Sequence, residues 1–306
     1  MDLASLEIFQ IVAAEMSVTK AAVRLGRAQS NVSTRIQQLE ESLGAALFSR
    51  EGKRMALTEQ GRVLMDYSMR LLALADEARQ AMHPTQPNGT LRIGAMESTA
   101  ATRLPAVVGA FHRQWPGVDL KVSTGHSLGL LRALDDGLID CAYIALPPHE
   151  HGSAQTLLAA QNLDGRAVFR EQIMLLISAA RPTLVAPGDA PLRLAAFKAG
   201  CTYRALGQRW IADQWPDGAQ RLHIEDVTSY DEMIARVAAG QCASFVPQSV
   251  LERNGPMADI QATHALDVDT WLVHRNGYAT PAFAQLSALS GQSPTSIALP
   301  EKGTLQ

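Results

Sequence analysis

The sequence predicts an α+β protein with two parts of different construction. In residues 1–82 apolar side chains recur three and four positions apart, which is the period of an α-helix. From Leu91 onward short apolar strands alternate with helical segments, as in a sheet covered by helices. Between these parts, residues 84–89 have the sequence PTQPNG. Two prolines and a glycine interrupt regular structure, so this stretch predicts a hinge.

The composition is that of an ordinary globular chain. Its 306 residues allow two or three domains, and the net charge of −3 gives no bulk attraction to nucleic acid. Residues 1–90 are also balanced, with ten basic and ten acidic side chains. No apolar stretch reaches the roughly 18 residues of a membrane span, and the N-terminus lacks the basic and apolar regions of a signal peptide. We therefore expect a cytoplasmic protein with no membrane partner.

Cysteine usage indicates neither disulfides nor a metal site. Cys141, Cys201 and Cys242 are odd in number and far apart, which favours reduced thiols. The chain has no CxxC motif and no Cys/His ligand spacing, and the HEH segment at residues 149–151 lacks a third spaced partner. We interpret that segment as a loop and expect no metal and no other cofactor.

A helix, a turn and a second amphipathic helix are predicted between Val18 and Leu43. Ala22, Gly26 and Val32 have the spacing in which a small residue allows close packing, a glycine adopts positive φ and a valine is buried. The second helix carries one apolar stripe, made of Val32, Ile36, Leu39 and Leu43. An earlier helix covers this core with Leu3, Leu6, Phe9 and Ala13. The pattern is that of a helix-turn-helix.

The other face of the second helix is polar and lies in a segment without acidic side chains, between Glu15 and Glu40. Polar side chains on an exposed helix can hydrogen-bond base edges in the major groove of DNA. The run from Phe48 to Leu57 predicts a basic hairpin, or wing, that contacts phosphates. The predicted DNA-binding residues are Arg27, Gln29, Ser30, Asn31, Ser33, Thr34, Arg35, Arg50, Lys53 and Arg54.

A long helix is predicted from Thr58, which can cap it, to about Met82. Its apolar residues alternate by three and four positions, as in a coiled coil. Because a lone exposed helix of this length is not stable in water, we expect it to pair with the same helix of a second subunit. Packing on its own domain is the alternative. The predicted dimerisation residues are Leu64, Tyr67, Leu71, Leu74 and Ala78.

At these positions the chain resembles the LysR-type transcriptional regulators. The resemblance is carried by the pattern AAxxLxxAQSNVSxxIxxLExxLGxxLFxR from Ala21, followed by LTxxG from Leu57. Two positions depart from the family's usual SQPAVS, with Ala28 in place of a serine and Ser30 in place of a proline. Ala28 cannot accept a capping hydrogen bond. Either Ser30 moves the cap forward, or the helix start is less stable by about 1 kcal/mol.

The alternating region predicts a parallel, α-covered sheet. Strands are expected at residues 91–95, 118–124, 139–146, 172–178, 201–204, 221–227, 242–246 and 269–274, and helices at 101–115, 128–136, 206–215, 230–239 and 281–290. The resemblance implies that these elements form two α/β lobes joined by two crossovers, similar to a periplasmic-binding protein, with a ligand between the lobes. The implied domains are a winged helix-turn-helix at 1–58, a linker helix and hinge at 59–89, and an effector-binding domain at 90–306. Lobe I is expected at about 91–165 and 266–306, and lobe II at about 166–265.

Polar residues follow several of these strands, where open α/β sheets bind ligands. The segments at residues 97–99 and 124–127 each end a strand and open a helix, whose free N–H groups favour an anion. Plain N-capping is the alternative interpretation. A small carboxylate is the expected effector, with Arg204 either its partner or an ordinary surface residue. The resemblance adds Thr202, Tyr203 and Arg204, where the family commonly contacts effector, and Phe245 and Val246, which resemble the family's apolar pocket wall unless they serve core packing alone. With these, the predicted effector-binding residues are Ser98, Thr99, Thr124, His126, Ser127, Thr202, Tyr203, Arg204, Phe245 and Val246.

Residues 125–129, GHSLG, also match the G-x-S-x-G nucleophile elbow, with Ser127 as the nucleophile. Such a serine needs a histidine base and an acid. The nominal histidine partners are His149, His151, His223, His264 and His274. No glycine-rich oxyanion segment precedes the motif, and a DNA-binding region fits no hydrolase.

The sequence therefore predicts a transcription regulator with no catalytic residues, which binds double-stranded DNA under the control of a small-molecule effector. The resemblance implies a homodimer or a dimer of dimers, that is a homotetramer, on an interrupted palindrome, and it allows contact with RNA polymerase. A solute-binding protein without a DNA role and a serine esterase using Ser127 are the alternatives. The sequence does not identify the effector, the operator or the direction of regulation.

Overall fold

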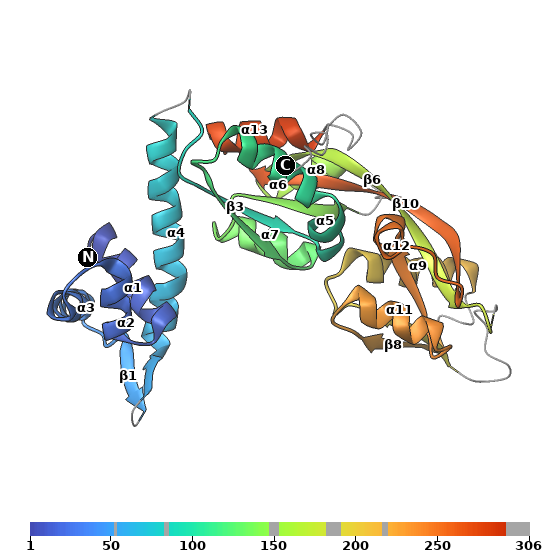
Figure 1. The fold of residues 1–306 in the computed structure, drawn as a ribbon, viewed down its shortest axis with the longest axis horizontal. Coiled ribbons are helices and arrows are strands. Elements are labelled where there is room, and N and C mark those ends of the chain that lie inside the picture. The colour runs from blue at the N-terminus through green and yellow to red at the C-terminus, as the bar shows by residue number, and fades with distance from the viewer. Residues whose placement is uncertain (52–53, 83–85, 147–152, 182–190, 216–219, 292–306) are drawn as a thin grey trace, which may run out of the picture. The chain divides into compact units, whose positions relative to one another are not determined.

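The computed structural model describes residues 1–51, 54–82, 86–146, 153–181, 191–215 and 220–291. The chain divides into two compact units, essentially Met1–His83 and the remainder, and each is described by itself. The first unit is a group of helices with a small hairpin, and the second is a mixed sheet with helices packed on it (Figure 1).

The first unit begins with three helices, α1 (Leu3–Glu15), α2 (Val18–Leu25) and α3 (Gln29–Leu43). Asp2 caps α1, because its side chain accepts a hydrogen bond from the N–H of Ser5. Ser17 caps α2 in the same way, accepting from Lys20. Gly26 ends α2 at φ 62°, a left-handed conformation that costs glycine nothing. The expected helix, glycine turn and second helix are therefore present.

One apolar core holds these helices together. Its buried residues include Leu6, Ile8, Phe9, Val12, Val32, Ile36 and Leu39. Two residues expected in the core lie at the surface instead, since Leu3 is 41% exposed and Leu43 is 39% exposed. Leu3 is the first residue of α1 and Leu43 is the last of α3, so both stand at helix ends beyond the packed faces.

A short antiparallel hairpin follows α3, as expected for a wing. Its strands are β1 (Phe48–Glu51) and β2 (Arg54–Leu57). Glu40 of α3 joins the hairpin to the helices, because its Oε1 accepts hydrogen bonds from the backbone N–H groups of Leu47 at 2.7 Å and of Phe48 at 3.3 Å. Hydrogen bonds to a charged acceptor are the stronger class. The Glu40 carboxylate therefore fixes the wing relative to α3.

The long helix α4 (Glu59–Ala81) follows directly. Thr58 caps it as predicted, since its Oγ1 accepts a hydrogen bond from Gly61 N at 2.9 Å. At Gly61 the helix approaches the chain before the wing so closely that a Cβ would lie 2.1 Å from the Leu47 carbonyl oxygen. A side chain at residue 61 would therefore force α4 away from this segment.

The second unit is built on an eight-stranded sheet with the order β4-β3-β5-β10-β6-β9-β7-β8. Lobe I contains β3 (Thr90–Ala95), β4 (Asp119–Thr124) and β5 (Cys141–Leu146), which run parallel to one another. Lobe II contains a second parallel group, β7 (Leu192–Ala196), β8 (Leu222–Asp226) and β9 (Ala243–Pro247).

Two long strands join the lobes, β6 (Leu163–Ser178) and β10 (Ile260–Arg275), each 16 residues long. They pair antiparallel from end to end and run side by side from one lobe into the other (Figure 1). The register shifts twice along this pair, between His264 and Leu266 and between Thr270 and Trp271. The two crossovers that the resemblance implied are thus a single paired ribbon.

Helices pack on both lobes. Lobe I carries α5 (Glu97–Thr102), α6 (Leu104–Gln114), α7 (Ser127–Asp135), α8 (Ala154–Ala160) and α13 (Pro281–Ser290), and lobe II carries α9 (Thr202–Gln214), α11 (Tyr230–Ala238) and α12 (Gln248–Asn254). A break at Arg103 divides the single helix expected at residues 101–115. Pro105, in the first turn of α6, has no N–H with which to continue α5.

Three predictions about strands were wrong in kind or in extent. The strand expected at residues 201–204 is the start of α9, where Tyr203, Gly207 and Ile211 are buried at helical spacing, and β7 is the strand of that unit. The strands expected at 172–178 and 269–274 are only parts of β6 and β10, whose other residues are more exposed and hide the apolar pattern. The sheet is mixed instead of parallel, because β6 and β10 run antiparallel to β9 and β5.

Candidate functional site

The polar side of α3 is open to solvent. The residues Arg27, Gln29, Ser30, Asn31, Ser33, Thr34 and Arg35 are all exposed. We call these residues the α3 polar face. Val32, Ile36 and Leu39 of the same helix are buried. Helical periodicity alone separates the two sides, which is why the sequence predicted this surface correctly.

The start of α3 has no side-chain cap. Ala28 is the N-cap residue and supplies no hydrogen bond, and Ser30 does not move the cap forward because the helix begins at Gln29. The first N–H groups of the helix are therefore left without a side-chain acceptor. Such a helix start is suited to an anion, for example a phosphate group.

Two arginines near this surface have acidic neighbours. Arg35 lies 3.7 Å from the carboxylate of Asp2, and Arg24 lies 3.0 Å from that of Glu15. Surface pairs of this kind contribute little, about 0–1 kcal/mol, so both arginines remain available to a stronger partner. Asp2 lies outside the acid-free segment, and the sequence spacing did not reveal its approach to Arg35.

The wing carries the remaining predicted basic residues. Arg50 and Arg54 lie in β1 and β2, as expected. Their side chains, and the whole of Lys53, fall outside the described part of the structure.

One side of α4 presents apolar residues to solvent. We call this the α4 stripe, and its exposed residues are Val63, Tyr67, Leu71, Leu74 and Ala78. Contrary to the prediction, Leu64 is not part of it, because Leu64 is 9% exposed and packs in the core of its own unit. Met1 and Leu43 continue the stripe into a groove of about 440 Å³.

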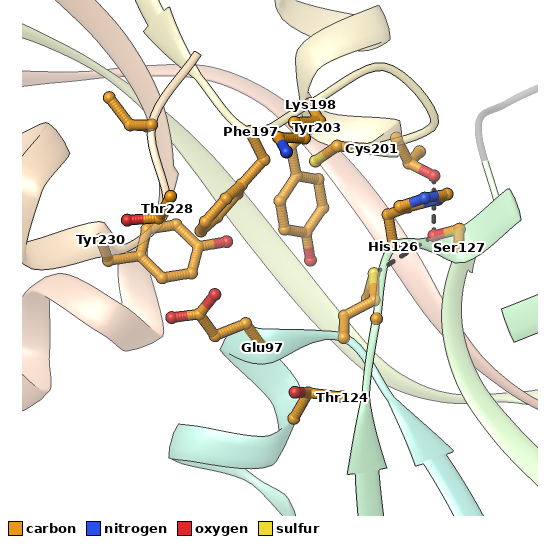
Figure 2. Close-up of a pocket in the computed structure, with 14 residues that line it drawn as sticks. Glu97, Thr124, His126, Ser127, Phe197, Lys198, Cys201, Tyr203, Thr228 and Tyr230 are labelled. Carbon is orange, nitrogen blue, oxygen red and sulfur yellow. Dashed lines mark hydrogen bonds between the residues drawn. The ribbon is translucent and has the colours of Figure 1, made fainter. Parts of the chain in front are cut away.

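A pocket of about 270 Å³ lies between the two lobes of the second unit. We call it the interlobe pocket. Lobe I lines it with residues that follow β3 and β4, including Glu97, Thr124, His126 and Ser127. Lobe II lines it with residues that follow β7 and β8, including Phe197, Lys198, Cys201, Thr202, Tyr203, Thr228 and Tyr230 (Figure 2). The carboxyl ends of parallel strands are where open α/β sheets bind ligands.

The pocket brings together half of the predicted effector residues, namely Thr124, His126, Ser127, Thr202 and Tyr203. The others do not line it. Ser98 and Thr99 lie in the first turn of α5 but are each only 2% exposed. Phe245 packs edge-on against Trp210 with ring centroids 5.6 Å apart, and Val246 belongs to the core that also contains Met233 of α11. Their apolar character reflects core packing.

Arg204 does not line the pocket. Its Nη1 donates to the backbone oxygen of Phe197 at 3.0 Å and to Asp226 Oδ1 at 2.7 Å. These contacts tie the start of α9 to the ends of β7 and β8. The arginine that was expected to hold a carboxylate is therefore occupied by the protein itself.

Sequence reasoning missed Phe197 and Lys198 because it did not place β7, the strand that they follow. It missed Thr228 and Tyr230, which lie between the strand expected at 221–227 and the first residue of the helix expected at 230–239, because no ligand role was assigned to that turn. Glu97 could have been predicted together with its neighbours Ser98 and Thr99, because it lies at the start of α5, directly after the end of β3.

Thr202 joins the lobes at the pocket. Its Oγ1 lies 2.9 Å from Ser127 Oγ and 3.1 Å from the Ala145 carbonyl oxygen, both in lobe I. Close by, Leu128 N of lobe I donates to Gly200 O of lobe II at 3.5 Å. Side chains that were expected to contact a ligand thus contact each other across the pocket.

Two of the helix starts at the pocket, those of α7 and α11, have a side-chain cap, and the start of α5 has none. At α7, His126 Nδ1 accepts a hydrogen bond from Gly129 N at 3.0 Å. At α11, Ser229 Oγ accepts from Glu232 N at 3.1 Å. At α9, the N-cap residue Cys201 makes no side-chain cap hydrogen bond, and burial raises the pKa of its thiol. The N–H donors that were expected to bind an anion are therefore partly occupied.

Burial also acts on the charged and phenolic groups of the pocket. It raises the pKa of Glu97 above the usual value of 4.5, and the negative charge of Asp231 raises it further. Burial raises the pKa values of Tyr203 and Tyr230, so both phenols stay neutral near pH 7. Glu97 is thus an acid held where its negative charge is unfavourable.

No described helix is long and apolar enough to cross a membrane. Within the described residues, no group of three or more His, Cys, Asp or Glu side chains could hold a metal ion.

Two family models match the chain and together span most of it. The model described as "LysR substrate binding domain" matches residues 84–293, and the one described as "Bacterial regulatory helix-turn-helix protein, lysR family" matches residues 3–62. The chain belongs to the LysR family of transcriptional regulators. The predicted fold class is confirmed as well, with a DNA-binding helix-turn-helix followed by a two-lobed α/β effector-binding domain.

This LysR-type regulator has relatives of similar length in Bacillus subtilis (strain 168). It is 33% identical over 253 residues to the HTH-type transcriptional regulator GltR, covering 82% of this chain and 81% of that protein. It is 32% identical over 255 residues to the uncharacterised HTH-type transcriptional regulator YusT, covering 83% and 81%.

Solved structures share the fold of this regulator at lower identity. Full-length CbnR in complex with its target DNA matches with a TM-score of 0.63 and 19% identity, over 97% of this chain and 100% of that one. The probable transcriptional regulator PA0477 from Pseudomonas aeruginosa matches with a TM-score of 0.67 and 18% identity, over 96% and 97%.

The comparisons support a transcriptional regulator and give no support to an esterase that uses Ser127. Ser127 Oγ contacts Thr202 Oγ1 and donates to Met96 Sδ at 3.4 Å. Across the described residues no histidine hydrogen-bonds to it, and the relatives are transcriptional regulators, which supports the prediction of a protein that is not an enzyme. The match of residues 3–62 to a DNA-binding family likewise excludes a solute-binding protein without a DNA role.

Proposed function

We propose that this regulator binds its operator through the α3 polar face and the wing, and that a small molecule in the interlobe pocket controls that binding. The contact between Thr202 and Ser127 carries the second part of the proposal. A ligand that enters the pocket must either displace this contact or favour it. Ligand binding then shifts the balance between lobe arrangements, which is the coupling that an allosteric regulator requires.

On the DNA side, side-chain chemistry divides the α3 polar face into two roles. Gln29 or Asn31 can pair with adenine in the major groove and Arg35 with guanine. The uncapped start of α3 and the basic residues of the wing, Arg50, Lys53 and Arg54, suit backbone phosphates. Binding to chromosomal DNA also requires the cytoplasmic location that the sequence predicts.

The regulator works as a dimer, with the α4 stripe packed on the stripe of a second copy. The exposed residues recur at helical spacing along a helix of 23 residues, and Tyr67 and Leu74 are more than half exposed in the single chain. Burial of such residues is the main driving force of helix pairing. Two copies also present two α3 helices to two half-sites. A dimer of dimers is the further assembly that the family relation supports.

The test uses the full-length protein and an operator obtained by selection from random DNA. Arg35→Ala is expected to weaken operator binding, measured by fluorescence anisotropy. Thr124→Trp, a substitution at an exposed position of the pocket wall, is expected to remove the thermal stabilisation that a metabolite library gives to the wild type. Stabilisation by the same metabolites in both proteins would contradict the proposed role of the pocket. Unchanged DNA binding by Arg35→Ala would contradict the proposed role of the α3 polar face.

A further inference from the structure

The carboxylate of Glu97 lies in the interlobe pocket without a positive partner. Glu97 is the first residue of α5, and its side chain extends toward Tyr230 (Figure 2). In the described part of the chain it forms neither a hydrogen bond nor an ion pair that would stabilise its charge. Burial and the neighbouring Asp231 both disfavour that charge. An acid kept in such a place is more readily explained by a ligand than by folding.

Three aromatic rings belong to the same region of the pocket. Phe197, Tyr203 and Tyr230 come from lobe II and lie on one side of Glu97 (Figure 2). Phe197 and Tyr230 are held edge to face, with ring centroids 4.9 Å apart and an interplanar angle of 88°. The face of an aromatic ring attracts a cation within about 6 Å of its centre. Rings of this kind next to a carboxylate form a binding environment for a positive group.

Several of the donors that an anion would need are engaged elsewhere, while the starts of α5 and α9 have no side-chain cap. His126 and Ser229 accept from the N–H groups at the starts of α7 and α11, and Arg204 is held by Asp226. Lys198 is the one lysine or arginine among the described lining residues. It is exposed, and Figure 2 places it beyond the aromatic rings as seen from Glu97.

We infer that the effector of this regulator carries an organic ammonium group, which binds between the Glu97 carboxylate and the rings of Phe197, Tyr203 and Tyr230. The inference rests on the proposed effector role of the pocket and names the chemistry of its ligand. A pocket of about 270 Å³ is near the lower end of the range for small-molecule sites, so the ligand is of metabolite size. The carboxylate effector that the sequence suggested lacks its main partner, since Arg204 does not line the pocket and is engaged by Phe197 O and Asp226.

The test compares three phenyl compounds of similar size that carry an ammonium, a hydroxyl or a carboxylate group: phenethylamine, phenethyl alcohol and phenylacetate. Choline and cadaverine serve as ammonium ions of other shapes. Their binding to the full-length protein is measured by calorimetry and by thermal shift. At least one ammonium ion is expected to bind more tightly than the alcohol and the carboxylate. Glu97→Gln should weaken that binding about tenfold or more, because it removes a charge-assisted contact. Glu97→Asp should retain part of it.

Glu252→Gln is the matched control, because Glu252 lies on α12, does not line the pocket and pairs with Gln248. It should leave ammonium binding unchanged. Binding of phenylacetate but of none of the ammonium ions, failure of every ammonium ion to bind, or ammonium binding that survives Glu97→Gln would each overturn the inference.

Thr124→Trp separates this inference from the proposed function. If phenylacetate binds the wild type and Thr124→Trp abolishes its binding, the pocket is the effector site and only the ammonium chemistry is wrong. If ligands bind the wild type and Thr124→Trp alters the binding of none of them, the proposed role of the pocket fails as well.

Discussion

The start of α3 differs from two of the helix starts at the interlobe pocket in its side-chain cap. α3 begins after Ala28, which offers no side-chain acceptor, although its backbone oxygen accepts a hydrogen bond from Asn31 N at 3.1 Å. α7 and α11 begin with His126 and Ser229, whose side chains accept hydrogen bonds from backbone N–H groups of the first turn. The protein thus caps the starts of α7 and α11 beside the pocket, and it leaves the start of α3, on the surface proposed to bind DNA, without a side-chain cap. We therefore expect these caps to affect binding as well as stability.

The largest expected effect is on the DNA side of this comparison. Arg35→Ala should weaken operator binding by about 1–3 kcal/mol, which corresponds to roughly 5- to 150-fold, if Arg35 pairs with a guanine. Anisotropy titrations with operator and with unrelated DNA measure it, and specificity should fall along with affinity. Arg24→Ala, at another exposed arginine that is paired with Glu15, is the control and should change little. An equal loss from both variants would show that only overall charge matters.

The next largest effect is expected from the removal of a side-chain cap at a helix that starts beside the interlobe pocket. Ser229→Ala removes the side-chain cap of α11, which should lower the free energy of unfolding by about 1 kcal/mol. It also frees Glu232 N, so the pocket should accept anionic ligands better than before. Urea denaturation and calorimetry with phenylacetate measure the two changes, and Ser229→Asp should preserve the stability. If Ser229→Ala leaves both quantities as they were, the cap has no role here.

The reverse experiment adds a side-chain cap to the start of α3. Ala28→Ser adds an acceptor at the N-cap of α3 and should raise the free energy of unfolding by about 0.5–1 kcal/mol. Operator binding should weaken by a similar or smaller amount, because the new hydroxyl competes with a phosphate for the same N–H groups. Urea denaturation measures the change in the free energy of unfolding, and fluorescence anisotropy on the same protein sample measures the change in operator affinity. Tighter operator binding without added stability would break the comparison.

The smallest effect is on the pH dependence of stability. The folded protein holds a proton on Glu97 more tightly than the unfolded chain does, because the pKa of Glu97 is raised above 4.5. Stability from this group is therefore complete below pH 4.5 and declines as the pH rises through the raised pKa. Glu97→Gln removes the decline, so its melting temperature should exceed that of the wild type near pH 7 by on the order of 1 °C. The two proteins should converge at acid pH. A lower melting temperature for Glu97→Gln at pH 7 would contradict the unfavourable burial of this charge.

Much of the first unit could be predicted from the sequence, because helical periodicity determines which residues of a helix face outward. Val32, Ile36 and Leu39 define the buried side of α3, and the exposed polar face follows from them. The contact between Arg35 and Asp2 could not be predicted, since it depends on where the start of α1 lies.

The pocket was predictable only in part, for two reasons. A turn after a strand marks a binding edge, which located Thr124, His126 and Ser127. The sequence gives no direction for a side chain, however, so Arg204 was assigned to the pocket although it bonds to Asp226. The rings of Phe197, Tyr203 and Tyr230 come together only because β7 and β8 are neighbours in the sheet, and the sequence does not show which strands are neighbours.

The paired ribbon of β6 and β10 constrains how the lobes can move. Because both strands continue without a break through the region between the lobes, no flexible linker can absorb a rotation there. A rotation of one lobe relative to the other must instead twist the paired strands β6 and β10. Irregular pairing of this kind adds local twist and bending, and the two register shifts therefore place the pivot near residues 264–271. The resistance of the β6–β10 pair to twisting therefore sets how far a given binding energy can change the angle between the two lobes.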